Sequence, residues 1–165
     1  RMPRGYTLFE LLLALTLTAV LAAIAYPGFR AWLLDSRRDA VVASTLHAVH
    51  AARQFAAARG ESIELCATVD AANCSGGSDW SRGLLILGAG GSVYRSLPAS
   101  NPERGPRLSS NRPFLHFEAG TSFASPATFT ICDRRGSRAA RAVIVSRSGR
   151  PRVSERDASD RALRC

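Results

Sequence analysis

The chain has 165 residues, 46% of them hydrophobic, and a formal net charge of +9. This length suits one membrane-anchored domain rather than two domains. The sequence presents no Ser/His/Asp set, no paired carboxylates and no phosphate-binding glycine loop, so we expect neither an enzyme nor a cofactor.

An apolar segment, residues 6–25, follows a short basic leader, residues 1–5. Twenty residues are enough for a helix to cross about 30 Å of hydrocarbon. Arg1 and Arg4 precede the segment without an acidic neighbour, which favours a cytoplasmic N-terminus and places the rest of the chain across the membrane. Glu10 lies within the apolar segment, where a carboxylate costs about 2.5–3.5 kcal/mol or more, so it needs a partner.

The small-residue junction lies before the apolar segment, whereas the cleavage site of a secretory signal follows it. This arrangement resembles the type IV prepilin signature, and a plain signal anchor is the alternative. The residues that carry the resemblance are Gly5, Tyr6, Thr7, Leu8, Glu10 and Pro27. The resemblance implies cleavage after Gly5, methylation of the new N-terminus at Tyr6, and pairing of Glu10 with the N-terminal amine of a neighbouring subunit in a filament.

Helix-forming composition resumes after Pro27, so we expect that proline to bend the helix rather than end it. The second part, residues 28–59, is predicted to be amphipathic and to stop at Gly60. Its apolar face consists of Val42, Leu46, Val49 and Ala56. His47 and His50 lie one turn apart, but without a third ligand we expect them to pack rather than to bind metal. Trp32 is a candidate interfacial anchor.

The remainder, residues 60–165, is predicted to be β-rich, with an irregular excursion at 98–113 that contains four prolines. The expected strands are 62–68, 83–87, 93–97, 114–117, 127–132, 141–146 and 150–154. One N-terminal helix on a mostly antiparallel sheet is an α+β fold. Trp80 is expected to fill the core.

Four cysteines follow the apolar segment, and in an exported compartment they should be oxidised. Three pairings are possible. We favour Cys66–Cys74, which closes a short loop, and Cys132–Cys165, which restrains the C-terminal segment. Zinc binding is the alternative, but the spacing is poor and we expect no metal.

The positive charge is concentrated towards the C-terminus. Residues 6–133 contain ten arginines and ten acidic residues, whereas residues 134–165 contain ten arginines and three acidic residues, a net charge of +7. Such asymmetry favours a polyanionic partner. The alternative is ordinary solvated surface charge.

Motifs in the β-rich part narrow the class of protein. The segments 79–83, 127–133 and 142–153, together with Arg135 and Gly136, resemble minor pilins and pseudopilins of the GspH/FimT family. The resemblance implies the type IV pilin fold. FimT-type members are linked to DNA uptake in natural transformation through a Gly-Arg-x-Arg element near the C-terminus, which this chain contains at residues 149–152.

The element has a geometry suited to phosphate. Arg150 and Arg152 share one face of an extended chain, and two guanidinium forks suit the backbone of double-stranded DNA without reading its sequence. The other candidate DNA-binding residues are Gly149, Arg147, Arg134, Arg135, Arg138 and Arg141. Alternatively, these arginines form salt bridges with Glu155, Asp157 and Asp160.

The sequence therefore predicts a minor pilin that binds extracellular DNA non-specifically for natural transformation. The alternative is a structural minor pilin, or a pseudopilin of type II secretion, that primes or caps filament assembly without binding DNA. The expected partners besides DNA are major and minor pilins, a prepilin peptidase and the inner-membrane assembly platform. We expect a single-pass inner-membrane protein with a periplasmic C-terminal domain that later reaches the cell surface in a filament.

Overall fold

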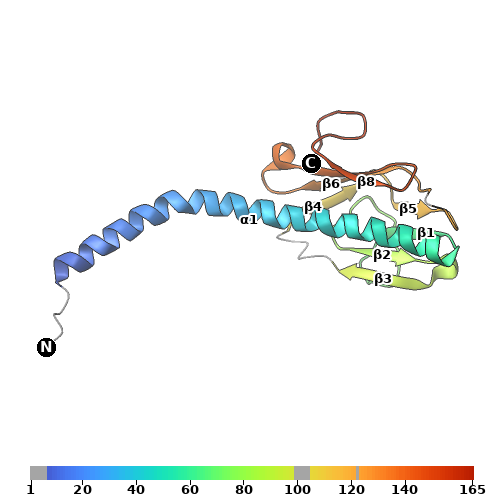
Figure 1. Ribbon diagram of the computed structural model, residues 1–165, viewed down its shortest axis with the longest axis horizontal. Coiled ribbons are helices and arrows are strands. Elements are labelled where there is room, and N and C mark those ends of the chain that lie inside the picture. Colours follow the sequence, from blue (N-terminus) through green and yellow to red (C-terminus); the bar gives the residue numbers. More distant parts are fainter. Residues whose placement is uncertain (1–6, 99–104, 122) are drawn as a thin grey trace. The chain divides into compact units, whose positions relative to one another are not determined.

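The computed structural model describes residues 7–98, 105–121 and 123–165. The chain forms two compact units, and the boundary between them falls between Ser36 and Arg37. The elements in chain order are α1 (Leu8–Arg59), β1 (Ile63–Ala67), β2 (Gly83–Leu87), η1 (Ala89–Gly91), β3 (Val93–Pro98), β4 (Arg107–Ser110), β5 (Phe114–Phe117), β6 (Ala127–Cys132), η2 (Gly136–Ala139), β7 (Arg141–Val145) and β8 (Pro151–Ser154) (Figure 1).

The first unit consists of the N-terminal part of α1, which begins with a capping box. The Thr7 N–H donates to Glu10 Oε2 at 2.9 Å, and the Glu10 N–H donates back to Thr7 Oγ1 at 3.3 Å. This reciprocal pair satisfies two backbone donors that a helix start leaves open. The helix continues through Pro27, as predicted. It is long and apolar enough to cross a membrane, by length and composition. The predicted cleavage junction, Gly5 and Tyr6, lies outside the described residues.

Over its described residues, the second unit contains two antiparallel sheets of four strands each. The first has the strand order β3-β2-β1-β5, with Leu65 of β1 between Ile86 of β2 and Leu115 of β5. The second has the order β4-β6-β7-β8, in which Phe129 of β6 pairs with Val143 of β7. The sequence led us to expect one sheet, and the eight strands instead divide into two.

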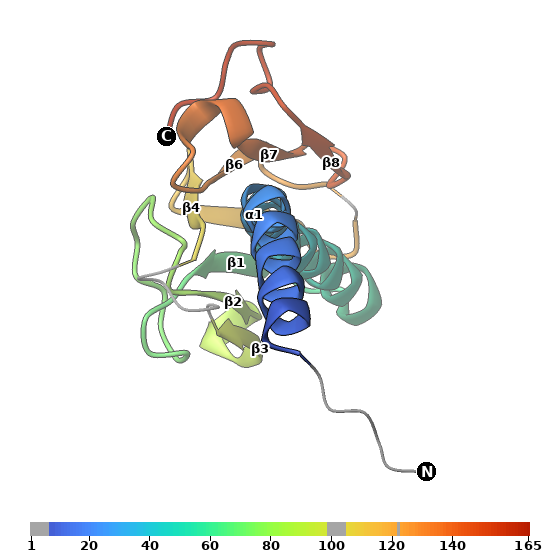
Figure 2. The same cartoon turned by 90° about the vertical axis from the view of Figure 1, so that its left-hand side faces the viewer.

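The core of the second unit joins both sheets to the C-terminal part of α1 (Figure 2). The predicted helix face is confirmed, because Val42, Val49 and Ala56 are buried and Leu46 packs against the core. Ala48 and Ala52 are also buried. Their small side chains allow the helix axis to approach the sheets closely. Trp80 is buried as predicted, with its ring 4.9 Å from that of Phe129 in an edge-on arrangement.

The prediction that residues 98–113 are irregular is wrong for β4. This strand pairs with β6, with Arg107 opposite Cys132 and Ser110 opposite Phe129. Its burial alternates, so Leu108 and Ser110 face inwards. The prolines at 106 and 113 lie outside the strand and remove no donor from its ladder.

The segment after β8 folds back over the outer face of the second sheet. Leu163 is buried in a small cluster on that face. The other members of the cluster are Cys132, Ala140, Ala142 and Ile144. In Figure 2 the red C-terminal segment leaves β8, arches over the second sheet and ends, at the label C, on the side of β6. The Cys132–Cys165 disulfide fixes its end to β6.

Candidate functional site

The Gly-Arg-x-Arg element begins in the tight turn that connects β7 to β8. The Gly149 N–H donates to the Ser146 carbonyl at 2.9 Å, and the Ser146 N–H donates to the Arg150 carbonyl at 3.1 Å. Gly149 has a φ of +68°, a conformation that glycine adopts without steric cost. Three-residue hairpin loops commonly end in such a residue. Gly149 therefore shapes the turn from which the arginines project.

Three arginines of the β7–β8 hairpin, Arg147, Arg150 and Arg152, are exposed, and we call them the hairpin arginines. Among the residues that the structure describes, their side chains form no hydrogen bond or ion pair. Arg152 pairs with Ile144 across the ladder, and β8 is the edge strand of its sheet. Alternation along the chain gives Arg150 and Arg152 the same side. The hairpin arginines thus present three uncompensated positive charges at one sheet edge.

Arg134 and Arg138 are exposed at the opposite end of β7. Arg138 lies in η2, immediately before β7, whereas the hairpin arginines follow its last residue. A five-residue strand spans roughly 17 Å. The structure therefore separates these two arginines from the hairpin arginines rather than joining all of them into one compact patch.

The predicted site residue Arg135 has an intramolecular partner. Its Nε lies 3.0 Å and its Nη2 2.6 Å from Asp133 Oδ2. Burial raises the pKa of Asp133, but hydrogen bonds from Arg135 and the charges of Arg135 and Arg38 outweigh this, so the pKa lies below its usual value. The Arg135 guanidinium is therefore already engaged by Asp133.

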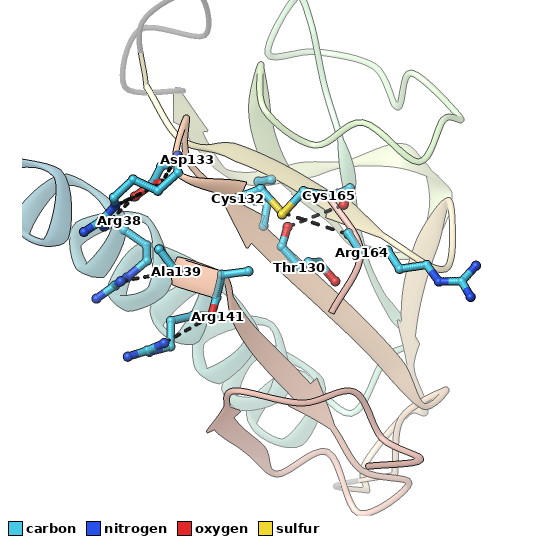
Figure 3. Close-up of a disulfide and its surroundings, with 12 residues drawn as sticks. Arg38, Thr130, Cys132, Asp133, Ala139, Arg141, Arg164 and Cys165 are labelled. Atoms are coloured by element: carbon cyan, nitrogen blue, oxygen red, sulfur yellow. Dashed lines mark hydrogen bonds and ion pairs between the residues drawn. A yellow bond between two sulfur atoms is a disulfide. The ribbon is translucent and has the colours of Figure 1, made fainter. Parts of the chain in front are cut away.

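Arg141 is likewise engaged. Its Nη2 lies 3.0 Å from Glu155 Oε1, and its Nη1 donates to the Ala140 carbonyl at 3.1 Å. Figure 3 shows Arg141 and Arg38 on the helix side of β6 and β7. Arg141 therefore forms a salt bridge with Glu155, as the alternative interpretation of the sequence expected.

Two arginines of the C-terminal segment are paired as well. Arg161 Nε lies 2.9 Å from Asp157 Oδ2, and Arg156 Nη1 donates to the Asp160 carbonyl at 2.8 Å. A hydrogen bond from the Arg161 N–H is the largest cause of a lowered pKa at Asp157. Local acidic residues thus offset much of the charge beyond β8, while the hairpin arginines stay uncompensated.

The cysteines form Cys66–Cys74 and Cys132–Cys165, the two pairs that we favoured from the sequence. Glu64 Oε1 lies 3.4 Å from Cys74 Sγ. Both sulfurs beside Glu64 belong to a disulfide, so this group offers no thiolate to a zinc ion. Figure 3 shows the second disulfide between β6 and the C-terminal segment, with the Arg164 side chain pointing away from it.

One residue near the hairpin arginines was not predicted from the sequence. The Ala124 N–H donates to the Arg147 carbonyl at 2.9 Å, which brings the exposed Phe123 beside the turn. The two segments are more than twenty residues apart and β6 and β7 lie between them. No local pattern in the sequence signals this contact.

The long helix, the antiparallel sheets and the apolar N-terminus define a type IV pilin-like protein. Residues 42–149 match the family described as type II transport protein GspH, and residues 1–26 match the prokaryotic N-terminal methylation motif. The first match covers more than half of the chain, which therefore belongs to the GspH family. The search of curated proteins gives no match.

Solved structures of a minor pilin share this fold. One crystal structure of type IV minor pilin FimU from Pseudomonas aeruginosa strain PAO1 has a TM-score of 0.54 and 22% identity, covering 79% of this chain and 97% of that one. A second crystal form of FimU has a TM-score of 0.56 and 22% identity, covering 81% and 95% respectively. At this identity the similarity establishes the fold alone.

The family gives the protein its class. It is a minor pilin or pseudopilin of a type IV pilus or a type II secretion system, and the GspH family consists of structural proteins rather than enzymes. Other pilins and the prepilin peptidase are the partners that the family implies. The methylation motif and the apolar helix are consistent with an inner-membrane prepilin that becomes part of a filament.

Proposed function

We propose that this protein is a minor pilin of a type IV pilus that binds extracellular DNA non-specifically for uptake in natural transformation. One observation carries the proposal. Within a strongly basic region, Arg135, Arg141, Arg156 and Arg161 have acidic partners. The exposed hairpin arginines have none among the described residues. Guanidinium groups that are not neutralised within the chain can contact phosphates of a passing polyanion.

The expected binding mode follows from the chemistry of the site. Guanidinium groups contact phosphates as bidentate forks, and such contacts position the duplex without reading its sequence. Each phosphate engaged lowers log affinity by roughly 0.9 per unit of log salt concentration. Arg134 and Arg138, at the other end of β7, provide a secondary contact for a duplex that extends along the strand. An uptake machine has to accept any sequence, which this mode allows.

The remaining assignments complete the proposal. Residues 1–5 form a cytoplasmic leader that is cleaved after Gly5, and the new N-terminus at Tyr6 is methylated. Residues 6–27 cross the membrane and later lie in the filament core, residues 28–59 form the amphipathic helix, and residues 60–165 form the periplasmic domain. When the inner-membrane assembly platform adds the protein to the filament, the Glu10 carboxylate gives up its hydrogen bonds from Thr7. It then pairs with the N-terminal amine of a neighbouring subunit.

The test compares two double variants of the full-length chain in detergent micelles. Arg150→Gln with Arg152→Gln removes two hairpin arginines, whereas Arg156→Gln with Arg161→Gln removes two arginines that have acidic partners. We expect the first pair to weaken binding to mixed-sequence duplex DNA at least tenfold and to lower the salt slope by roughly 1.8. The second pair should change affinity much less. Equal losses in both variants, or no loss in the first, would contradict the assignment.

The second candidate is a structural subunit that primes or caps the filament without binding DNA. The observation that favours it is the family match, which ends at Gly149 and leaves Arg150 and Arg152 outside. A chromosomal Arg150→Gln with Arg152→Gln strain separates the two functions. Piliated cells that no longer take up DNA support the first candidate, whereas cells with normal uptake support the second.

A further inference from the structure

An aromatic ring is exposed in the loop between β5 and β6. Phe123 is 52% exposed, whereas its neighbour Ala124 is 5% exposed. Adjacent residues of an extended segment point to opposite sides, so the buried Ala124 turns the Phe123 ring towards solvent. The Phe123 carbonyl accepts from the Glu118 N–H at 3.0 Å, and Ala124 forms a bridge with Phe117. The backbone that carries the ring is therefore attached to β5.

The same backbone is attached to the hairpin. The Ala124 N–H donates to the Arg147 carbonyl at 2.9 Å. Consecutive Cα atoms lie about 3.8 Å apart, so the Phe123 backbone is one residue from this hydrogen bond. An exposed aromatic side chain and the hairpin arginines consequently emerge from adjoining backbone.

We propose that Phe123 and the hairpin arginines together form a site for single-stranded DNA, an inference that rests on the proposed function. The arginines contact phosphates, and an unpaired base stacks on the Phe123 ring. In a duplex the faces of the bases are covered by their neighbours, whereas in a single strand each base can offer a π-face. Basic side chains combined with an aromatic ring are the recurring means of binding single strands without sequence preference.

The experiment measures binding of two probes to the full-length chain in detergent micelles. The probes are fluorescent oligothymidine of about 20 nucleotides and a blunt duplex of equal length. We expect Phe123→Ala to weaken binding of the single strand about fivefold or more, the loss of one stacked base, and to leave duplex binding within about twofold. Phe123→Tyr should keep single-strand binding and Phe123→Leu should lose it, because stacking requires a ring.

Phe114 provides a matched control. It is also a phenylalanine, is 48% exposed, and lies at the opposite end of β5 from the bridge to Ala124. Phe114→Ala should leave binding of both probes unchanged. Equal effects at Phe114 and Phe123, or equal losses for both probes, would overturn the inference. The proposed function survives such a failure of the single-strand site if Arg150→Gln with Arg152→Gln still weakens duplex binding. If neither probe binds the wild-type protein, both the single-strand site and the proposed function are contradicted.

Discussion

Asp133 is held by Arg135, two residues further along the chain, through side-chain contacts of 3.0 and 2.6 Å to Oδ2. The Asp133 side chain is 4% exposed and that of Arg135 is 28% exposed. The pair follows the end of β6 and precedes η2. Arg38, a buried arginine of α1, donates to the Ala139 carbonyl at 3.0 Å in the same region. The arginine-rich segment that follows β6 looks like basic surface in the sequence. Part of it, however, forms hydrogen bonds and an ion pair that stabilise the fold.

Removal of Arg135 should destabilise the second unit. Arg135→Gln leaves a buried carboxylate with one principal partner fewer, which costs about 1–3 kcal/mol. The neighbouring Arg134 is exposed, so Arg134→Gln should change stability by no more than about 0.5 kcal/mol. Thermal unfolding in detergent micelles, followed by near-ultraviolet circular dichroism, checks the difference. Equal stability of the two variants would contradict the anchoring role.

The same carboxylate predicts a loss of stability in acid. Although burial opposes it, the net effect of Arg135 and Arg38 is to place the pKa of folded Asp133 below that of the unfolded chain. A lowered pKa in the folded state stabilises the protein above the unfolded value of about 3.9, and this contribution is lost as the pH falls through the folded pKa. The melting temperature should therefore decrease when the pH is lowered below about 4. Asp133→Asn should lower the melting temperature at neutral pH and make it depend less on pH in acid. If the pH dependence in acid is unchanged in this variant, Asp133 is not its cause.

The two disulfides should differ in their effect on stability. The Cys132–Cys165 pair spans 33 residues, whereas the Cys66–Cys74 pair spans eight. Loop-closure entropy then predicts losses of about 4 and about 2.5 kcal/mol when each pair is replaced by serines. Loss of the longer loop should also release the segment that carries Leu163, which trypsin would report by faster cleavage at Arg161. The opposite order of stability, with unchanged proteolysis, would show that the segment is held by other contacts.

Gly149 should tolerate few replacements. At a φ of +68° alanine costs about 1–2 kcal/mol, and asparagine costs less because its side chain can hydrogen-bond locally. Gly77 is a control, because a Cβ there meets only ordinary contact at 3.9 Å. Gly149→Ala should speed amide hydrogen exchange around the turn and weaken DNA binding, whereas Gly77→Ala should do neither. A turn that exchanges normally in Gly149→Ala would remove the proposed need for glycine.

Sequence patterns predicted most of the fold because its elements are regular. Helical periodicity identified Val49 and Ala56 as buried, and short apolar runs bounded by turn residues located most strands. They failed at β4, where a four-residue strand is flanked by prolines and only Leu108 marks it as apolar. Nor did they separate two sheets from one, because that division depends on which strands pair across long distances.

The candidate site was predictable in composition but not in pairing. The positions of Arg147, Arg150 and Arg152 after an expected strand indicated a basic edge. The fold places acidic residues beside some arginines, as Glu155 lies beside Arg141, and leaves others unpaired within the described part of the chain. This pairing depends on tertiary structure and cannot be predicted from the order of the residues. The position of Phe123 depends on one backbone hydrogen bond between distant segments, which leaves no periodic signal.

Pro151 reduces the number of backbone hydrogen-bond donors at the free edge of β8. The Ser146 N–H bond to the Arg150 carbonyl fixes the ladder so that Pro151 and Val153 direct their backbone groups outwards. Pro151 has no N–H to donate, so only the Val153 N–H is available there for adding a foreign strand. Arg150 and Arg152 add like charges that repel the same edge of another copy. Both features disfavour pairing of this sheet edge with the same edge of a second copy of the chain.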